Sequence, residues 1–156
     1  MENNHQRDAC SVRDATPDDL SAILDIEAHS FRGDRFSRRQ FRYLMQRALA
    51  SFVVAVVDRQ VRAYAILFTP RRHAVARLYS VAVHPDAQGK GLGKHLLLHH
   101  LKLAADLGYP RLRLEVRQDN HTAIALYEKL GFRWFTDKPD YYEDGCAASC
   151  YEIQLD

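Results

Sequence analysis

The sequence contains few of the features on which secreted, membrane-spanning or nucleic-acid-binding proteins depend. Its three cysteines are odd in number, give no disulfide framework and fit a reducing cytoplasm. No apolar run approaches the roughly 20 residues of a membrane span, and the polar start has no apolar segment of a secretory signal. A formal net charge of +2 is too small to favour nucleic acid. We therefore expect a cytoplasmic globular protein that binds neither membrane nor nucleic acid.

Metal-binding spacings are present but incomplete. His95 and His99 are four residues apart on a predicted helix, and Cys146 and Cys150 are separated by three residues. No cluster of carboxylates and histidines accompanies either pair, as a catalytic zinc site would require. A solvated polar face accounts for the histidines, and the sequence predicts no metal.

The length of 156 residues suits one domain with one core. We expect residues 1–10 to be a flexible tail and residues 11–156 to be a single domain, either monomeric or homodimeric. Apolar alternation and helical spacing predict the order β-α-α-β-β-β-α-β-α-β-β. The expected strands are 12–15, 52–57, 61–68, 74–83, 111–117, 132–135 and 149–155, and the expected helices are 17–31, 38–49, 92–107 and 121–130.

This order belongs to the α/β class, in its mixed α+β form. Strands 74–83 and 111–117 are joined by a helix and are expected to be parallel neighbours. The earlier strands are linked by hairpins and are expected to be antiparallel. The prediction is a mostly antiparallel mixed sheet of about seven strands with helices on both faces.

The most informative segment is Gln88 to Lys94, which has three glycines where a strand ends and a helix begins. Bare N–H groups at a helix N-terminus favour an anion, so the expected ligand carries phosphate. The segment is one residue too short for a P-loop, and Lys94 is followed by His95 rather than Ser or Thr. Its third glycine comes too early for a dinucleotide fingerprint. A glycine-rich turn without a ligand is the alternative.

A different phosphate loop matches better. Gln88-x-x-Gly91-x-Gly93, preceded by Val81-Ala82-Val83-His84-Pro85, resembles the acetyl-coenzyme A loop of the GNAT acyltransferase superfamily. The resemblance implies the GNAT fold, with the parallel strands splayed at the cofactor site, and acetyl-CoA as co-substrate without a metal. The residues it implies for cofactor binding are Val81, Ala82, Val83, Gln88, Gly89, Lys90, Gly91, Leu92, Gly93, Lys94, Asn120 and Tyr127.

The resemblance continues downstream. Leu112-x-Leu114-Glu115-Val116-Arg117, Asn120 and the run from Ala123 to Phe132 resemble the ribosomal-protein alanine N-acetyltransferase (RimI-like) branch. It implies a direct ternary-complex mechanism with Glu115 as general base and Tyr127 as general acid.

Glu115, Tyr127 and Asn120 each also have a structural interpretation. By alternation Glu115 shares a face with Arg113 and Arg117 and could form an ion pair with them. Tyr127 could be core packing, and Asn120 is at least a helix N-cap.

The acceptor is less well defined by the sequence. Residues 32–47 contain six arginines, whereas residues 137–144 contain four acids around Tyr141 and Tyr142. By the same resemblance these segments flank the acceptor, with Phe31, Arg35, Tyr141 and Tyr142 as substrate-binding residues. Both segments could equally be solvated surface. One departure is the segment 145–149, which lacks the acids often found there and leaves acceptor specificity open.

Three functions are therefore considered. The leading one is acetyl transfer to a primary amine, either a protein or peptide N-terminal α-amine or a lysine. A small-molecule amine acetyltransferase is the second. The third is a binding module that senses acyl-CoA without turnover.

Overall fold

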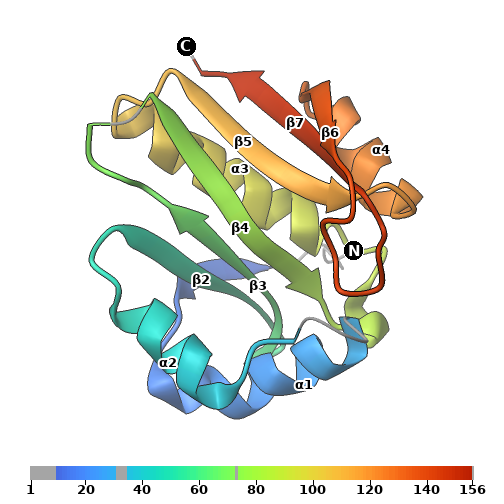
Figure 1. Cartoon of the computed structure of the whole chain (residues 1–156). Helices are drawn as coiled ribbons and strands as arrows, with labels where there is room; N and C mark the ends of the chain where they lie inside the picture. Colours follow the sequence, from blue (N-terminus) through green and yellow to red (C-terminus); the bar gives the residue numbers. More distant parts are fainter. Residues whose placement is uncertain (1–9, 31–34, 73, 156) are drawn as a thin grey trace, which may run out of the picture.

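The computed structural model describes residues 10–30, 35–72 and 74–155, which form one seven-stranded sheet with helices on both faces (Figure 1). The order of elements is the one that the sequence predicts. The strands are β1 (Ser11–Asp14), β2 (Ala50–Val57), β3 (Gln60–Phe68), β4 (Val75–Val83), β5 (Arg111–Arg117), β6 (Arg133–Lys138) and β7 (Ala148–Gln154). The helices are α1 (Leu20–Ser30), α2 (Arg38–Gln46), α3 (Leu92–Asp106) and α4 (His121–Lys129), with short 3-10 turns η2 (Pro17–Asp19) and η3 (Pro85–Ala87).

The sheet has the strand order β1-β2-β3-β4-β5-β7-β6. β4 and β5 form a parallel pair, and the other neighbouring strands are antiparallel. The crossover through α3 makes the parallel pair possible. The predicted fold class, a mostly antiparallel mixed sheet between helices, is confirmed.

Side-chain alternation on β2 divides the core into two layers. Phe52 and Val54 pack with α1 and α2 on one face, and Val53 and Ala55 pack under α3 on the other. Beyond β4, α4 joins α3 on this second face, where Leu114 and Tyr127 share a cluster. The opposite face of β5 carries charged residues, because α1 and α2 lie against β2, β3 and β4.

A bulge in β4 separates the two parallel strands. Leu78 is paired with Leu67 and Ser80 with Ile66, which leaves Tyr79 as an extra residue on β4. Pairing between β4 and β5 ends at Leu78, opposite Leu114. Because a bulge bends its strand and increases the local twist, β4 leaves β5 where the bulge occurs. This produces the predicted splay.

The predicted boundaries differ most from the structure at the ends of α2 and β6. α2 ends at Gln46, so Ala48 and Leu49 lie outside the helix that was expected to reach residue 49. The carbonyl of Leu49 instead accepts a hydrogen bond from the N–H of Thr69, which extends the β2–β3 ladder. β6 runs to Lys138 rather than residue 135, because its pairing with β7 continues to Lys138 opposite Ala148. None of the helices in the described residues has the length and apolarity to cross a bilayer.

Candidate active site

The glycine loop has the backbone geometry of a tight anion-binding turn. Gly89 and Gly91 have φ of +82° and +76°, the left-handed region that other residues adopt only with strain. Gly91 is the N-cap of α3, so the loop presents the first N–H groups of that helix. The carbonyl of Gly91 already accepts the first helical bond, from His95. The loop therefore combines free donors with the positive end of the α3 dipole.

Gly93 is different, because the fold alone does not require glycine there. Its φ lies outside the left-handed region, and a Cβ would meet Leu126 Cδ2 at 3.6 Å and Val83 Cγ2 at 3.8 Å, both ordinary contacts. Glycine near a helix start usually costs stability relative to alanine. A glycine without a folding role fits a position that a ligand approaches closely.

The strand that precedes the loop has an available edge. Val81 to Val83 pair with Ala65 to Ala63 on one side. On the other side they lie beyond the last pair with β5, and no strand among the described residues covers them. An exposed strand edge can bind an extended amide-containing chain as an added strand does. The predicted cofactor residues 81–83 and 88–94 therefore lie on consecutive segments, the open edge of β4 and the loop that leads into α3.

The predicted base, Glu115, is the first residue of β5 beyond the last pair with β4. Its side chain is 14% exposed, and its carboxylate accepts two charged hydrogen bonds. Arg77 Nε donates to Oε2 at 3.0 Å, and Lys138 Nζ donates to Oε1 at 2.9 Å. The carboxylate is therefore held at the point where the strands separate.

These partners correct the predicted ion pair of Glu115 with Arg113 and Arg117. Arg113 Nε instead donates to Glu152 at 2.8 Å, and Arg117 Nη2 donates to Asp144 at 2.6 Å. Residues two apart on a strand are separated by about 6.7 Å, whereas residues on neighbouring strands come closer. Arg77 on the neighbouring strand β4 and Lys138 at the end of β6 therefore take the Glu115 carboxylate, whereas Arg117 pairs with Asp119 and Asp144.

Tyr141 and Tyr142 lie beside this carboxylate. Tyr141 Oη accepts a hydrogen bond of 3.1 Å from Arg77 Nη2, and Lys138 Nζ lies 5.5 Å from the centre of the Tyr141 ring. The two tyrosine rings meet edge to face at 5.0 Å. Burial raises the pKa of Tyr142, and the nearby Tyr141 and Glu115 raise it further.

The predicted acid, Tyr127, is buried on α4, and its ring packs edge to face on Phe132 at 5.8 Å. Burial raises its pKa, and the neighbouring Tyr142 adds to the shift. The phenol is therefore neutral at physiological pH and carries a proton that it can donate. The charge of Glu115 also acts on Tyr142, which in turn acts on Tyr127. The core-packing interpretation of Tyr127 is compatible with a role as donor.

The remaining predicted residues have mixed outcomes. Asn120 is confirmed as the N-cap of α4, since its Oδ1 accepts a 3.2 Å hydrogen bond from the N–H of Ala123. Phe31 lies outside the described residues. Arg35 is exposed, and its charge acts on the buried Glu27.

Glu27 was not predicted as a functional residue. Its side chain is buried, and burial raises its pKa. Its Oε1 accepts a 3.2 Å hydrogen bond from the N–H of Phe36, and the hydroxyl of Tyr64 donates to its other oxygen. It therefore anchors the backbone directly before the N-cap of α2. The signal in the sequence was a carboxylate on the apolar stripe of α1.

A second group that sequence spacing missed is formed by Asp25, His29 and His84, whose potential ligand atoms all lie within 4.8 Å of one another. The N–H of Asp86 donates to His84 Nδ1, so the neutral ring carries its proton on Nε2. That nitrogen is 3.1 Å from Asp25 Oδ2 and donates to it. The His84 ring therefore joins the Asp86 N–H to the Asp25 carboxylate through hydrogen bonds.

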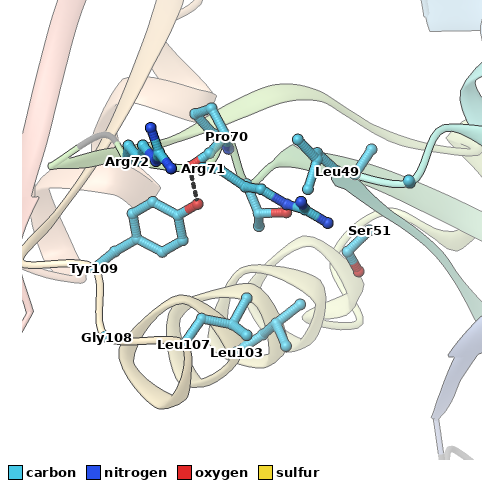
Figure 2. Close-up of a pocket in the computed structure, with 12 residues that line it drawn as sticks. Leu49, Ser51, Pro70, Arg71, Arg72, Leu103, Leu107, Gly108 and Tyr109 are labelled. Carbon is cyan, nitrogen blue, oxygen red and sulfur yellow. Dashed lines mark hydrogen bonds between the residues drawn. The ribbon is translucent and has the colours of Figure 1, made fainter.

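A cavity of about 540 Å³ lies at the other end of α3 from the glycine loop (Figure 2). Leu103, Leu107 and Tyr109 line one side, and the Tyr109 hydroxyl donates to the carbonyl of Pro70. Ser51 lines the cavity and contacts the buried His100 Nε2 at 3.1 Å. Burial lowers the pKa of His100 to about 3, so its ring stays neutral. Among the described residues that line this cavity there is no carboxylate.

Comparisons with known proteins agree with the geometry of the glycine loop. Residues 19–132 match the model of the acetyltransferase (GNAT) family. The chain is 38% identical over 129 residues to ribosomal protein bS18-alanine N-acetyltransferase of Salmonella typhimurium, covering 80% of this chain and 81% of that protein.

Two solved structures extend this comparison to the fold. The crystal structure of the ribosomal-protein-S18-alanine N-acetyltransferase from Escherichia coli matches with a TM-score of 0.83 and 31% identity, over 94% of both chains. The structure of yncA from Salmonella typhimurium, determined with its cofactor acetyl-CoA, matches with a TM-score of 0.79 and 27% identity, over 95% of both chains.

Proposed function

The chain belongs to the acetyltransferase (GNAT) family, and we propose that within this family it acetylates the α-amine of a protein N-terminus. The acceptor we infer is the N-terminal alanine of a ribosomal protein of the bS18 kind, as in the relative with 38% identity. The observation that carries the proposal is the contact of a primary ammonium, that of Lys138, with Glu115 and the Tyr141 ring. An acidic and aromatic site of this kind suits a peptide N-terminus.

Acetyl-coenzyme A is the proposed acetyl donor, and when bound it supplies the acetyl group as an activated thioester. The N–H groups of residues 89–94 would hold its pyrophosphate, because they stand at the positive end of α3. The β4 edge at residues 81–83 would pair with the amides of its pantetheine arm. The glycine without a folding role, Gly93, supports this assignment.

Glu115 is the proposed general base. An α-amine has a pKa near 8 and is mostly ammonium at pH 7, so it has to lose a proton before it attacks. The Glu115 carboxylate takes this proton directly or through one water. Arg77 and Lys138 hold the carboxylate in position through their hydrogen bonds. An incoming ammonium that replaces Lys138 at Oε1 keeps the charge balance of the site.

Tyr127 is the proposed general acid. Its phenol is neutral because burial raises its pKa. A neutral phenol can give a proton to the departing thiolate, after which solvent restores it. The amine attacks the thioester directly, so no covalent intermediate with the protein is needed.

The test is an acceptor panel with acetyl-CoA, followed by free thiol release and by product mass. The panel contains a peptide with an N-terminal alanine, the same peptide with a blocked N-terminus and an internal lysine, and a polyamine. We expect thiol release only with the peptide that has a free N-terminal alanine. Turnover with the polyamine alone would contradict the peptide acceptor and favour a small-molecule acetyltransferase. Tight acetyl-CoA binding without thiol release would favour an acyl-CoA sensor.

The proposal also concerns the setting of the enzyme. A ribosomal protein acceptor places it in the cytoplasm. We expect residues 11–156 to act as one domain, whether as a monomer or a homodimer.

A further inference from the structure

The chain places one of its own primary amines in the proposed acceptor site. Lys138 is the last residue of β6, and its side chain is 48% exposed. Its Nζ is 2.9 Å from Glu115 Oε1 and 5.5 Å from the centre of the Tyr141 ring. The carboxylate and the tyrosine are the groups that we assign to an acceptor ammonium. Lys138 therefore contacts both groups that we assign to the acceptor amine.

We propose that Lys138 is a self-acetylation site, at which Nζ receives the acetyl group from acetyl-CoA bound to the same chain. The inference rests on the proposed function, since it uses the same donor and the same base. It goes beyond that function, because the acceptor is a side chain of the enzyme. β6 and β7 hold this amine at the splay between β4 and β5 through their own pairing.

The reaction balances without another reagent. The Lys138 ammonium gives one proton to Glu115, and the resulting neutral Nζ attacks the carbonyl carbon of the thioester. The N–C bond forms as the C–S bond breaks, and the electron pair of the C–S bond leaves on sulfur. Tyr127 donates a proton to that sulfur and is reprotonated, through solvent, by the second proton that leaves the nitrogen, and Glu115 releases its proton to solvent. The products are N-acetyl-Lys138, coenzyme A thiol and one proton released to solvent.

The same geometry distinguishes Lys138 from the other four lysines. Lys90 and Lys94 belong to the glycine loop, and Lys129 is the last residue of α4. Lys102 is the best control, because its Nζ also lies 2.9 Å from a carboxylate, that of Asp106. That pair is on the exposed surface of α3, far along the helix from the glycine loop. Comparison of Lys138 with Lys102 therefore separates the effect of an ion pair from the effect of a position beside the proposed base.

Acetylation would change the base as well as the lysine. An acetylated Lys138 has no positive charge, so Glu115 would keep Arg77 and lose its second cation.

The experiment follows the intact chain after addition of acetyl-CoA without any acceptor. Peptide mapping by mass spectrometry measures the acetyl occupancy of each lysine against time, at several protein concentrations. We expect Lys138 to be modified more than about tenfold faster than Lys102, because it is held beside the base. The rate constant should not depend on protein concentration, as for a reaction within one chain.

Two variants and one parallel assay make the outcome decisive. Lys138→Arg should lose the fast modification, whereas Lys102→Arg should keep it. Equal rates at Lys138 and Lys102 would indicate spontaneous acylation and overturn the inference. If the alanine peptide is acetylated while Lys138 stays unmodified, the inference fails and the proposed function stands. If Lys138 is acetylated and no peptide of the panel reacts, self-acetylation stands and the proposed acceptor fails.

Discussion

Glu115 Oε2 on β5 lies 3.0 Å from Arg77 Nε on the parallel strand β4. The contact spans the last rungs of the parallel pair, since Leu78 and Leu114 form its final register pair. Beyond them the bulge at Tyr79 takes β4 away from β5. The ion pair therefore holds the proposed base at the apex of the gap that we assign to acetyl-CoA.

Replacing Glu115 by glutamine should lower kcat/KM for the alanine peptide by roughly 10²-fold or more, because the amide cannot accept the ammonium proton. Glu152→Gln is the matched control, since Glu152 also pairs with an arginine. That arginine is Arg113 of β5, whose Nε lies 2.8 Å from the Glu152 carboxylate. Both variants should lose only about 1 kcal/mol of unfolding free energy, as partly exposed ion pairs usually do. Steady-state kinetics and urea unfolding measure the two effects. Equal activity of the two variants would remove Glu115 from the mechanism.

Tyr127→Phe should lower kcat by roughly 10²-fold while acetyl-CoA affinity stays unchanged, because the ring and its contact with Phe132 remain and the proton donor is lost. Tyr151→Phe is the control, a buried tyrosine whose hydroxyl donates to Glu128 at 3.1 Å. Its kcat should stay close to that of the unsubstituted enzyme. Single-turnover kinetics and calorimetric titration provide the measurements, and unaltered turnover in Tyr127→Phe would refute the acid role.

Gly93→Ala should weaken acetyl-CoA binding without loss of stability, because the fold has room for a Cβ at this position. Gly91→Ala should instead destabilise the folded chain by about 1–2 kcal/mol, because φ of +76° is unfavourable for an L-residue. Calorimetric titration and thermal unfolding separate the two effects. If Gly93→Ala binds acetyl-CoA normally, the ligand does not approach the loop at Gly93.

His100 should make stability depend on pH. In the folded chain the pKa of His100 is about 3, whereas in the unfolded chain the pKa of this histidine is about 6.5. The unfolded state therefore binds more protons below about pH 6.5, and stability is lost as the pH falls from there toward about 3. Lowering the pH from 7 to 5 should therefore reduce the free energy of unfolding by about 2 kcal/mol through His100.

The measurement compares urea unfolding at the two pH values in the original chain and in His100→Leu, which removes the titrating group. The matched control is His95→Gln, which replaces an exposed histidine of the same helix. We expect His95→Gln to follow the original chain and His100→Leu to show the smaller loss. A loss of equal size in all three chains would contradict the depressed pKa of His100.

Local patterns in the sequence were sufficient for the order of elements and for the glycine loop. The alternation around Leu112, the cap at Asn120 and the left-handed glycines 89 and 91 are decided by nearest neighbours in the chain. Such preferences act through backbone sterics and hydrogen bonds within a few residues. The sequence by itself therefore determined the fold class and the segment to which we assign the cofactor.

Only the tertiary structure decided which charges meet. Alternation placed Glu115 with Arg113 and Arg117, but its partners are Arg77 and Lys138, which lie 38 and 23 positions away in the chain. The hydrogen bond from Tyr64 to Glu27 and the contact of Asp25 with His84 likewise join distant segments. Ion pairs and buried hydrogen bonds depend on distances of a few ångströms between separate elements. Those distances follow from strand register and from the bulge at Tyr79, which local patterns do not encode.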